Sequence, residues 1–150
     1  MRWLALDVGV RRVGVAVCDA EERVATALAA IPFAEEPALT RRVAGLVAHW
    51  EIGGVVVGMP LTRHGRSRGE VRVRRVVDAL REGLVVPVVT CDERGTTRAA
   101  EALLEEAGVP RGRWAEAVDS LAARLILEDH LAACREGIAR HDVDRRDADR

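Results

Sequence analysis

The fold of this chain is decided by the stretch Arg2-Trp3-Leu4-Ala5-Leu6-Asp7-Val8-Gly9-Val10-Arg11-Arg12-Val13-Gly14-Val15-Ala16-Val17. Two apolar runs flank a short turn that contains glycine, which predicts two strands joined by a tight connection. Uninterrupted apolar runs indicate strands that are buried on both faces of a sheet. Asp7 ends the first strand, where a carboxylate needs a metal ion, an arginine or backbone N–H groups to offset its desolvation. Asp7 is therefore the first candidate for chemistry.

The composition fits one globular domain. The chain has 150 residues, 49% of them hydrophobic, which is enough for a single core. All 23 basic residues are arginine, a bias that GC-rich codons explain. The net charge is only −1, so the overall charge does not point to nucleic acid, and the distribution of charge matters more than its sum.

Cys18, Cys91 and Cys134 are far apart and lack the spacing of metal ligands. We expect reduced thiols, with Cys18 and Cys91 packed in or near strands, as in a cytosolic protein. No secretory signal pattern precedes the first strand, and no apolar run reaches membrane-spanning length. These features predict a soluble, cytoplasmic protein that has no membrane partner.

The order of elements predicts an α/β fold with a mixed five-stranded sheet flanked by helices. We expect strands near 2–8, 13–18, 23–31, 53–60 and 84–90, and helices near 37–50, 69–82, 96–107 and 113–135. Pro87 is tolerated if the last strand lies at an edge. Trp3, Trp50 and Trp114 are expected in or near the core. Residues 1–136 are expected to form one domain, followed by a charged, disordered tail over 137–150.

A second acidic feature follows the fifth strand, at the edge of the sheet where α/β proteins bind ligands. Asp92 and Glu93 point to opposite faces while the strand lasts, so only one of them should share a site with Asp7, and Glu93 has the longer reach. The alternative is that both carboxylates favour the N-terminus of the next helix, with Thr96 or Thr97 as its cap.

Asp119 is the third acidic candidate. Its helical neighbours include Ala115, Ala122 and Ala123, so it lies on an apolar face that should dock on the sheet. The alternative is an N-cap of a helix that begins at residue 120. Carboxylates from two strand ends and one helix would make an all-oxygen pocket suited to Mg²⁺ or Mn²⁺. Two such ions support phosphodiester hydrolysis, so the pattern predicts a metal-dependent site.

Arginines gather after the fourth strand. A flexible, arginine-rich loop can follow a phosphate backbone, and the alternative is a solvated helix face. Arg11, Arg12 and Arg94 lie beside the acidic residues and are better placed to hold the scissile phosphate. Because no aromatic platform is visible, we expect backbone or shape readout rather than base stacking. The arginines after the fourth strand are Arg63, Arg66, Arg68, Arg72, Arg74 and Arg75.

Four motifs together resemble the YqgF/RuvX family, which comprises Holliday junction resolvase and pre-16S rRNA nuclease proteins. The motifs occur in family order and cover about residues 2–134. The resemblance implies an RNase H-like fold, a metal-dependent nuclease site and a cytoplasmic location. It places Asp7, Glu93 and Asp119 on the acidic positions that hold the metal and carry catalysis, and Arg12 on the basic position after the first turn. The motifs are residues 7–16, residues 56–60 with the loop after them, residues 92–97 and residues 118–123.

Two departures from the family pattern bear on substrate binding. Gly95 stands where the family usually has leucine, which loosens the start of the third helix. The loop over residues 62–69 is more basic than the Asn-, Asp-, Gly- and Ser-rich loop of the family. This difference indicates altered substrate binding rather than altered chemistry. The residues expected to contact nucleic acid are Arg11, Arg12, Arg63, Arg66, Arg68, Arg94, Thr96 and Thr97.

The expected function is a metal-dependent nuclease that acts on structured RNA and processes pre-16S rRNA. The alternative keeps the chemistry and takes branched DNA as the substrate, as a Holliday junction resolvase in recombination and repair. A nucleotide-binding half-domain of the sugar kinase or actin type also begins with Asp-x-Gly, but such proteins need two halves. A non-catalytic binding protein that keeps the fold is the fourth reading. A homodimer is considered for either nuclease.

Overall fold

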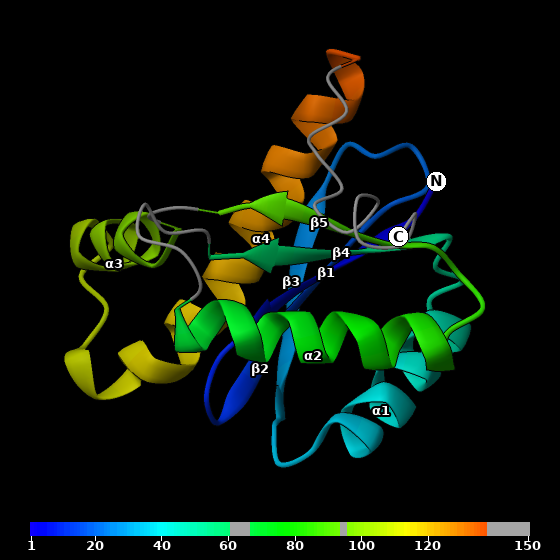
Figure 1. The fold of residues 1–150 in the computed structure, drawn as a ribbon. Helices are drawn as coiled ribbons and strands as arrows, with labels where there is room; N and C mark the ends of the chain where they lie inside the picture. The colour runs from blue at the N-terminus through cyan, green and yellow to red at the C-terminus, as the bar shows by residue number, and fades with distance from the viewer. Residues whose placement is uncertain (61–66, 94–95, 138–150) are drawn as a thin grey trace.

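A central sheet organises the protein (Figure 1). The computed structural model describes residues 1–60, 67–93 and 96–137, apart from the side chains of Thr96, Thr97 and Glu116. In these ranges five strands form one sheet in the order β3-β2-β1-β4-β5. Strands β1 to β3 are antiparallel, whereas β1, β4 and β5 run parallel, which confirms the predicted mixed sheet. The strands are β1 (Trp3–Val8), β2 (Arg12–Cys18), β3 (Ala25–Pro32), β4 (Gly54–Met59) and β5 (Val88–Asp92).

Helices cover both faces of the sheet (Figure 1). Helices α1 (Glu36–His49) and α2 (Arg68–Gly83) pack together on one face. Helix α4 (Trp114–Arg135) crosses the other face, and α3 (Thr96–Glu106) packs against it, with the short 3-10 helix η1 (Arg111–Arg113) between them in the chain. Within the described ranges no helix combines the length and the apolar character that crossing a bilayer requires.

Strand β1 contributes to two hydrophobic clusters, one on each face. Leu4 and Leu6 are fully buried in the cluster under α1 and α2. Ala5 is buried in the second cluster, which also contains Ile126 of α4. This confirms that the first strand is covered on both faces. Because successive strand residues alternate between faces, Asp7 points to the same side as Ala5, toward α4.

Two local expectations were wrong. The fifth strand begins at Val88 rather than at residue 84, because Pro87 has no N–H and joins the sheet only through its carbonyl, which accepts from Val55 at 2.9 Å. The strand does lie at the edge of the sheet, as Pro87 requires. Trp50 is 37% exposed rather than part of the core, because α1 ends at His49 and Trp50 follows as its C-cap.

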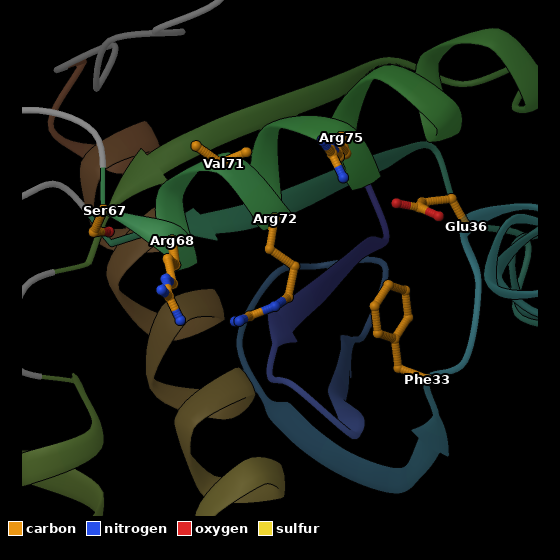
Figure 2. Close-up of a pocket in the computed structure, with 7 residues that line it drawn as sticks. All are labelled: Phe33, Glu36, Ser67, Arg68, Val71, Arg72 and Arg75. Atoms are coloured by element: carbon orange, nitrogen blue, oxygen red, sulfur yellow. The ribbon is translucent and has the colours of Figure 1, made fainter.

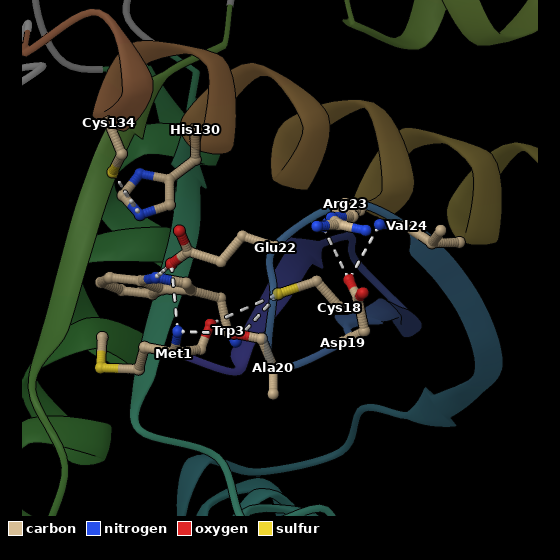
Figure 3. Close-up of polar contacts among 10 residues, drawn as sticks. All are labelled: Met1, Trp3, Cys18, Asp19, Ala20, Glu22, Arg23, Val24, His130 and Cys134. Carbon is tan, nitrogen blue, oxygen red and sulfur yellow. Dashed lines mark hydrogen bonds and ion pairs between the residues drawn. The ribbon is translucent and has the colours of Figure 1, made fainter.

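The end of the sheet where β1 begins holds two of the cysteines (Figure 3). The buried Cys18 sulfur accepts the Trp3 N–H at 3.2 Å. The Trp3 ring meets His130 edge-on, with 4.3 Å between ring centroids, and the Cys134 sulfur lies 3.6 Å from His130 Nε2. Cys91 is buried in β5, and all three cysteines are free thiols. The predicted packing of Cys18 and Cys91 is confirmed.

Candidate active site

Asp7 lies between two glycines of the neighbouring strands. In β2, Gly14 pairs with Asp7 across the antiparallel ladder. In β4, Gly58 directly follows Val57, the partner of Leu6, so it stands beside Asp7 on the other side. Residues at the same level of adjacent strands project to the same face. The face toward α4 therefore carries no side chain on either side of the Asp7 carboxylate.

The glycine in β2 admits the backbone of α4. A Cβ placed on Gly14 would collide with the Asp119 carbonyl and lie only 2.6 Å from its carbon. A backbone approach this close requires glycine. It brings Asp119 near enough to Asp7 for the negative charge of Asp119 to raise the Asp7 pKa. Helix α4 begins at Trp114, so Asp119 lies inside the helix and the N-cap alternative is wrong.

The glycine in β4 admits Glu93. The Cγ of Glu93 lies 3.3 Å from the position that a Cβ on Gly58 would take, so the Glu93 side chain passes over this glycine. The buried Cys91 thiol donates a hydrogen bond to Glu93 Oε1 at 3.2 Å and orients the carboxylate. Asp92, the last residue of β5, is exposed instead. Glu93 rather than Asp92 is therefore the carboxylate on this face.

The electrostatics of the acidic pair depend on burial and on one arginine. Burial and, to a smaller extent, the negative charge of Asp119 raise the pKa of Asp7 to about 6. Burial also raises the pKa of Asp119, while the Arg12 guanidinium opposes that rise, with its Nε 3.0 Å from Asp119 Oδ2. Among the described residues no hydrogen bond or ion pair reaches the Asp7 carboxylate. Its oxygen atoms are free to bind a cation.

A divalent cation fits the pair of Asp7 and Asp119. Burial and the charge of Asp119 both disfavour the ionised form of Asp7, and a cation between the two carboxylates would offset this effect. Magnesium is commonly held by one or two carboxylates, with water and substrate oxygens as its other ligands. In the described ranges no three His, Cys, Asp or Glu side chains come close enough to hold one ion together. The structure thus brings Asp7 and Asp119 together and holds Glu93 over the next strand.

Only some of the predicted nucleic-acid contacts can be located. Arg12, whose side chain is 40% exposed, begins β2 beside the acidic pair. Arg11 lies in the preceding turn, where its carbonyl accepts the Phe33 N–H at 2.8 Å. Arg68 is exposed at the start of α2. Three of the arginines and the side chains of two threonines lie outside the described part of the chain: Arg63, Arg66, Arg94, Thr96 and Thr97.

Sequence reasoning assigned no role to three residues that shape this region. Gly14 and Gly58 stood inside recognised motifs, and a glycine within a strand is a signal of close backbone approach that could have found them. Phe33 follows β3 and lines a hollow against α2. A single phenylalanine after a strand has no distinguishing signal, because such a residue usually packs into the core.

The chain is similar to nuclease families along nearly its whole length. A family model described as "RuvX: Holliday junction resolvase" matches residues 1–133. A protein of Chloroflexus aggregans named "Putative pre-16S rRNA nuclease" is 43% identical over 133 residues, which cover 88% of this chain and 94% of that protein. A protein of the same name from Thermoanaerobacter pseudethanolicus is 34% identical over 134 residues, which cover 87% and 96%.

Solved structures of resolvases share the fold. Thermus thermophilus RuvC in complex with a Holliday junction substrate aligns with a TM-score of 0.60 at 18% identity, over 93% of this chain and 98% of that chain. The fowlpox virus resolvase in complex with Holliday junction DNA aligns with a TM-score of 0.53 at 10% identity, over 89% and 99%. At such identities the likeness concerns the fold, and it confirms the RNase H-like architecture.

Proposed function

Since this chain belongs to the RuvX family of nucleases, we propose that it is a metal-dependent enzyme that cleaves structured nucleic acid and processes pre-16S rRNA. The observation that carries the proposal is the close pair of Asp7 and Asp119, because burial and the charge of Asp119 disfavour the ionised Asp7 carboxylate, which a bound cation would stabilise. Relatives named for pre-16S rRNA match the chain over nearly all of its length, which favours an RNA precursor as the substrate.

We assign Asp7, Asp119 and Glu93 to a site for two Mg²⁺ or Mn²⁺ ions, of which the adjacent pair of Asp7 and Asp119 would hold one. Two such ions, once bound, supply an activated water and stabilise the attacking and leaving oxygens of the phosphodiester. With its pKa at about 6, Asp7 is ionised at neutral pH and can act as a ligand. The Cys91 thiol holds the Glu93 carboxylate in place over β4 through its hydrogen bond.

Arginines beside the acidic residues would hold the scissile phosphate. The Arg12 guanidinium is anchored to Asp119 through Nε and is half exposed, so a phosphate oxygen can reach it from solvent. Arginine suits this task because its planar group donates two parallel hydrogen bonds to phosphate. We assign the same role to Arg11 and Arg94. The remaining proposed nucleic-acid contacts are Arg63, Arg66, Arg68, Thr96 and Thr97.

A Holliday junction resolvase is the second candidate, and the description of the family favours it. The chemistry at the carboxylates would be the same, with branched DNA in place of RNA. A four-way junction presents two equivalent strands, so this candidate calls for a two-fold symmetric homodimer with two active sites. In either case we propose a cytoplasmic protein whose nuclease domain spans residues 1–136, with residues 137–150 as a charged tail.

The experiment that tests the proposal compares two substrates with one preparation. A pre-16S rRNA fragment and a four-way DNA junction are incubated with the protein in Mg²⁺ or Mn²⁺, and the Asp7→Asn variant controls for contaminating nucleases. Faster metal-dependent cleavage of the RNA confirms the first candidate. Cleavage of the junction alone selects the second. If the folded protein cleaves neither, the enzyme assignment is wrong and a non-catalytic binding protein remains.

A further inference from the structure

A hollow of about 450 Å³ lies on the face of the sheet opposite α4 (Figure 2). One wall is formed by Phe33 and Glu36, where the chain leads from β3 into α1. The other wall is the first half of α2, from Ser67 to Arg75. We call this hollow the arginine groove, because three of its lining residues are arginines.

The three arginines of the groove are Arg68, Arg72 and Arg75. Their spacing places them on one face of α2, and Figure 2 shows Arg68 and Arg72 extending from the helix toward the level of the Phe33 ring. Within the described residues none of the three forms an ion pair or a hydrogen bond. With Glu36 as the one acidic lining residue, three positive charges face one negative charge, a net charge of +2.

Two other arginines in helices of the described ranges have acidic partners close at hand. Arg74, on the same helix, pairs with the buried Glu70 at 3.4 Å. Arg124 pairs with Glu128 at 2.9 Å. The three groove arginines instead line one hollow, and within the described residues no acidic side chain pairs with any of them. A ligand with several negative charges complements this lining.

Phe33 adds an aromatic surface to the same hollow. Its ring is partly buried against the core under α1 and α2, which holds it in place. Its N–H donates to the Arg11 carbonyl at 2.8 Å, which ties it to the turn after Asp7. An aromatic ring beside unpaired arginines is the combination that binds single-stranded nucleic acid, because bases stack on the ring while phosphates meet the cations.

The position of the groove restricts the shape of the nucleic acid that could fill it. The Asp7 carboxylate faces α4, whereas the groove lies on the face of the sheet that carries α1 and α2. The two are linked through the turn after Asp7, where the Arg11 carbonyl accepts the Phe33 N–H. A strand that occupies both sites must bend around the edge of the sheet. Double-stranded nucleic acid resists such bending, whereas a single strand does not.

We propose that the arginine groove binds a single-stranded segment of the substrate that flanks the scissile phosphate, with its phosphates on Arg68, Arg72 and Arg75 and a base against Phe33. This inference rests on the proposed nuclease function. The three arginines span about 10 Å along the helix axis, which gives room for successive phosphates of an extended strand. The enzyme would therefore prefer structured substrates that carry a single-stranded segment next to the cleavage site.

The test measures binding without cleavage. Fluorescence anisotropy in EDTA compares an RNA hairpin that carries a short single-stranded tail with the same hairpin lacking the tail, at several salt concentrations. The wild type should prefer the tailed hairpin. In the Arg72→Ala/Arg75→Ala variant, affinity for the tailed hairpin should fall by about tenfold or more, and its salt slope by about 1.4, since each lost single-strand contact removes about 0.7.

The matched control is Arg23→Ala/Arg135→Ala, which removes the same charge from exposed positions away from the groove. It should keep the preference for the tailed hairpin. Phe33→Leu retains apolar packing and should weaken binding of the tailed hairpin several-fold, whereas Phe33→Tyr should restore it. Equal losses on both hairpins, or a groove variant that behaves like the control, would overturn the proposal.

The same proteins separate failure of the groove from failure of the enzyme assignment. If the tail preference is present in EDTA but no cleavage occurs in Mn²⁺, the nuclease function is wrong and the groove stands. If the tailless hairpin is cleaved normally while the groove variants bind the tailed one like the wild type, the groove is wrong and the nuclease function stands.

Discussion

The main chain of Asp119 rests directly on Gly14, with no room for a side chain between them. Gly14 is also the cross-strand partner of Asp7, so one glycine sets the distance between two carboxylate residues that lie far apart in the sequence. On the other side of Asp7, Gly58 leaves the space over which Glu93 passes. The candidate active site therefore depends on two close contacts at glycines, that of Asp119 with Gly14 and that of Glu93 with Gly58, rather than on one loop.

Replacing Gly14 by alanine should displace α4 from the sheet. The added methyl group would meet backbone atoms of Asp119, which cannot move aside as a flexible side chain could. We expect a loss of about 1–3 kcal/mol in the free energy of unfolding, together with loss of Mn²⁺-dependent cleavage. Urea denaturation and cleavage assays measure the two effects.

Gly45→Ala is the control for this substitution, because a Cβ at Gly45 in α1 meets nothing within 4 Å. It should stabilise the protein by about 0.5–1 kcal/mol, since glycine is unfavourable inside a helix. A folded Gly14→Ala protein with normal activity would show that the spacing between α4 and the sheet does not matter for the site.

Asp7→Asn should abolish metal-dependent cleavage and leave the fold intact. Without metal it should also stabilise the protein at neutral pH. The pKa of Asp7 in the folded protein, about 6, lies above the ordinary value of 3.8. Ionisation of Asp7 therefore lowers the free energy of unfolding as the pH rises from about 3.8 to 6, and the loss is complete above pH 6. We expect a gain of about 1–3 kcal/mol at pH 7.5 that disappears near pH 4. Urea denaturation in EDTA at both pH values measures this gain in stability. Full cleavage activity in a folded Asp7→Asn protein would show that Asp7 is not part of the active site.

Asp119→Asn should reduce the stabilisation that metal provides. Metal that binds only the native protein raises the melting temperature, so the variant should gain less from Mn²⁺ than the wild type does. Without metal it should be at least as stable, because its loss of the half-exposed ion pair with Arg12 costs little, while repulsion of Asp7 is relieved. Thermal melts of both proteins with and without Mn²⁺ decide the matter. Equal metal-induced shifts would remove Asp119 from the metal site.

The arginines that precede and begin α2 should contribute to binding through phosphate contacts. Joint replacement of Arg63, Arg66 and Arg68 by alanine should weaken substrate binding and reduce the slope of log affinity against log salt by about 0.7–0.9 per lost contact. A titration of binding against salt concentration measures the slope. An unchanged slope would mean that these arginines form a solvated surface.

His130 should make the protein less stable in mild acid. Burial lowers the pKa of His130, although the charges of Glu22 (Figure 3) and of Asp129 act in the opposite direction. The unfolded chain takes up a proton near pH 6.5 that the native protein resists, so the free energy of unfolding falls as the pH drops below about 6.5. His130→Phe keeps a ring against Trp3 and should flatten this dependence between about pH 7 and pH 5.

The comparison is best made in the Asp7→Asn background, because Asp7 contributes with the opposite sign below pH 6. Urea denaturation at a series of pH values supplies the data. If the free energy of unfolding depends on pH with the same slope in both proteins, groups other than His130 cause the acid sensitivity.

The sequence by itself determined the secondary structure and the residue types of the site. Apolar runs marked β1, β2 and β4, and the 3.6-residue period marked the long last helix, predicted over 113–135 and observed over Trp114–Arg135. These signals are local, since each depends only on neighbours along the chain. Three motifs likewise named Asp7, Glu93 and Asp119 as the acidic residues to consider.

Only the tertiary structure decided how those residues meet. The order β3-β2-β1-β4-β5 sets Gly14 and Gly58 beside Asp7 and brings the Glu93 side chain over Gly58. It also places Phe33 across from the arginines of α2. None of these relationships follows from periodicity or motif spacing, because each depends on which strands become neighbours and on how closely a helix can approach a residue without a side chain.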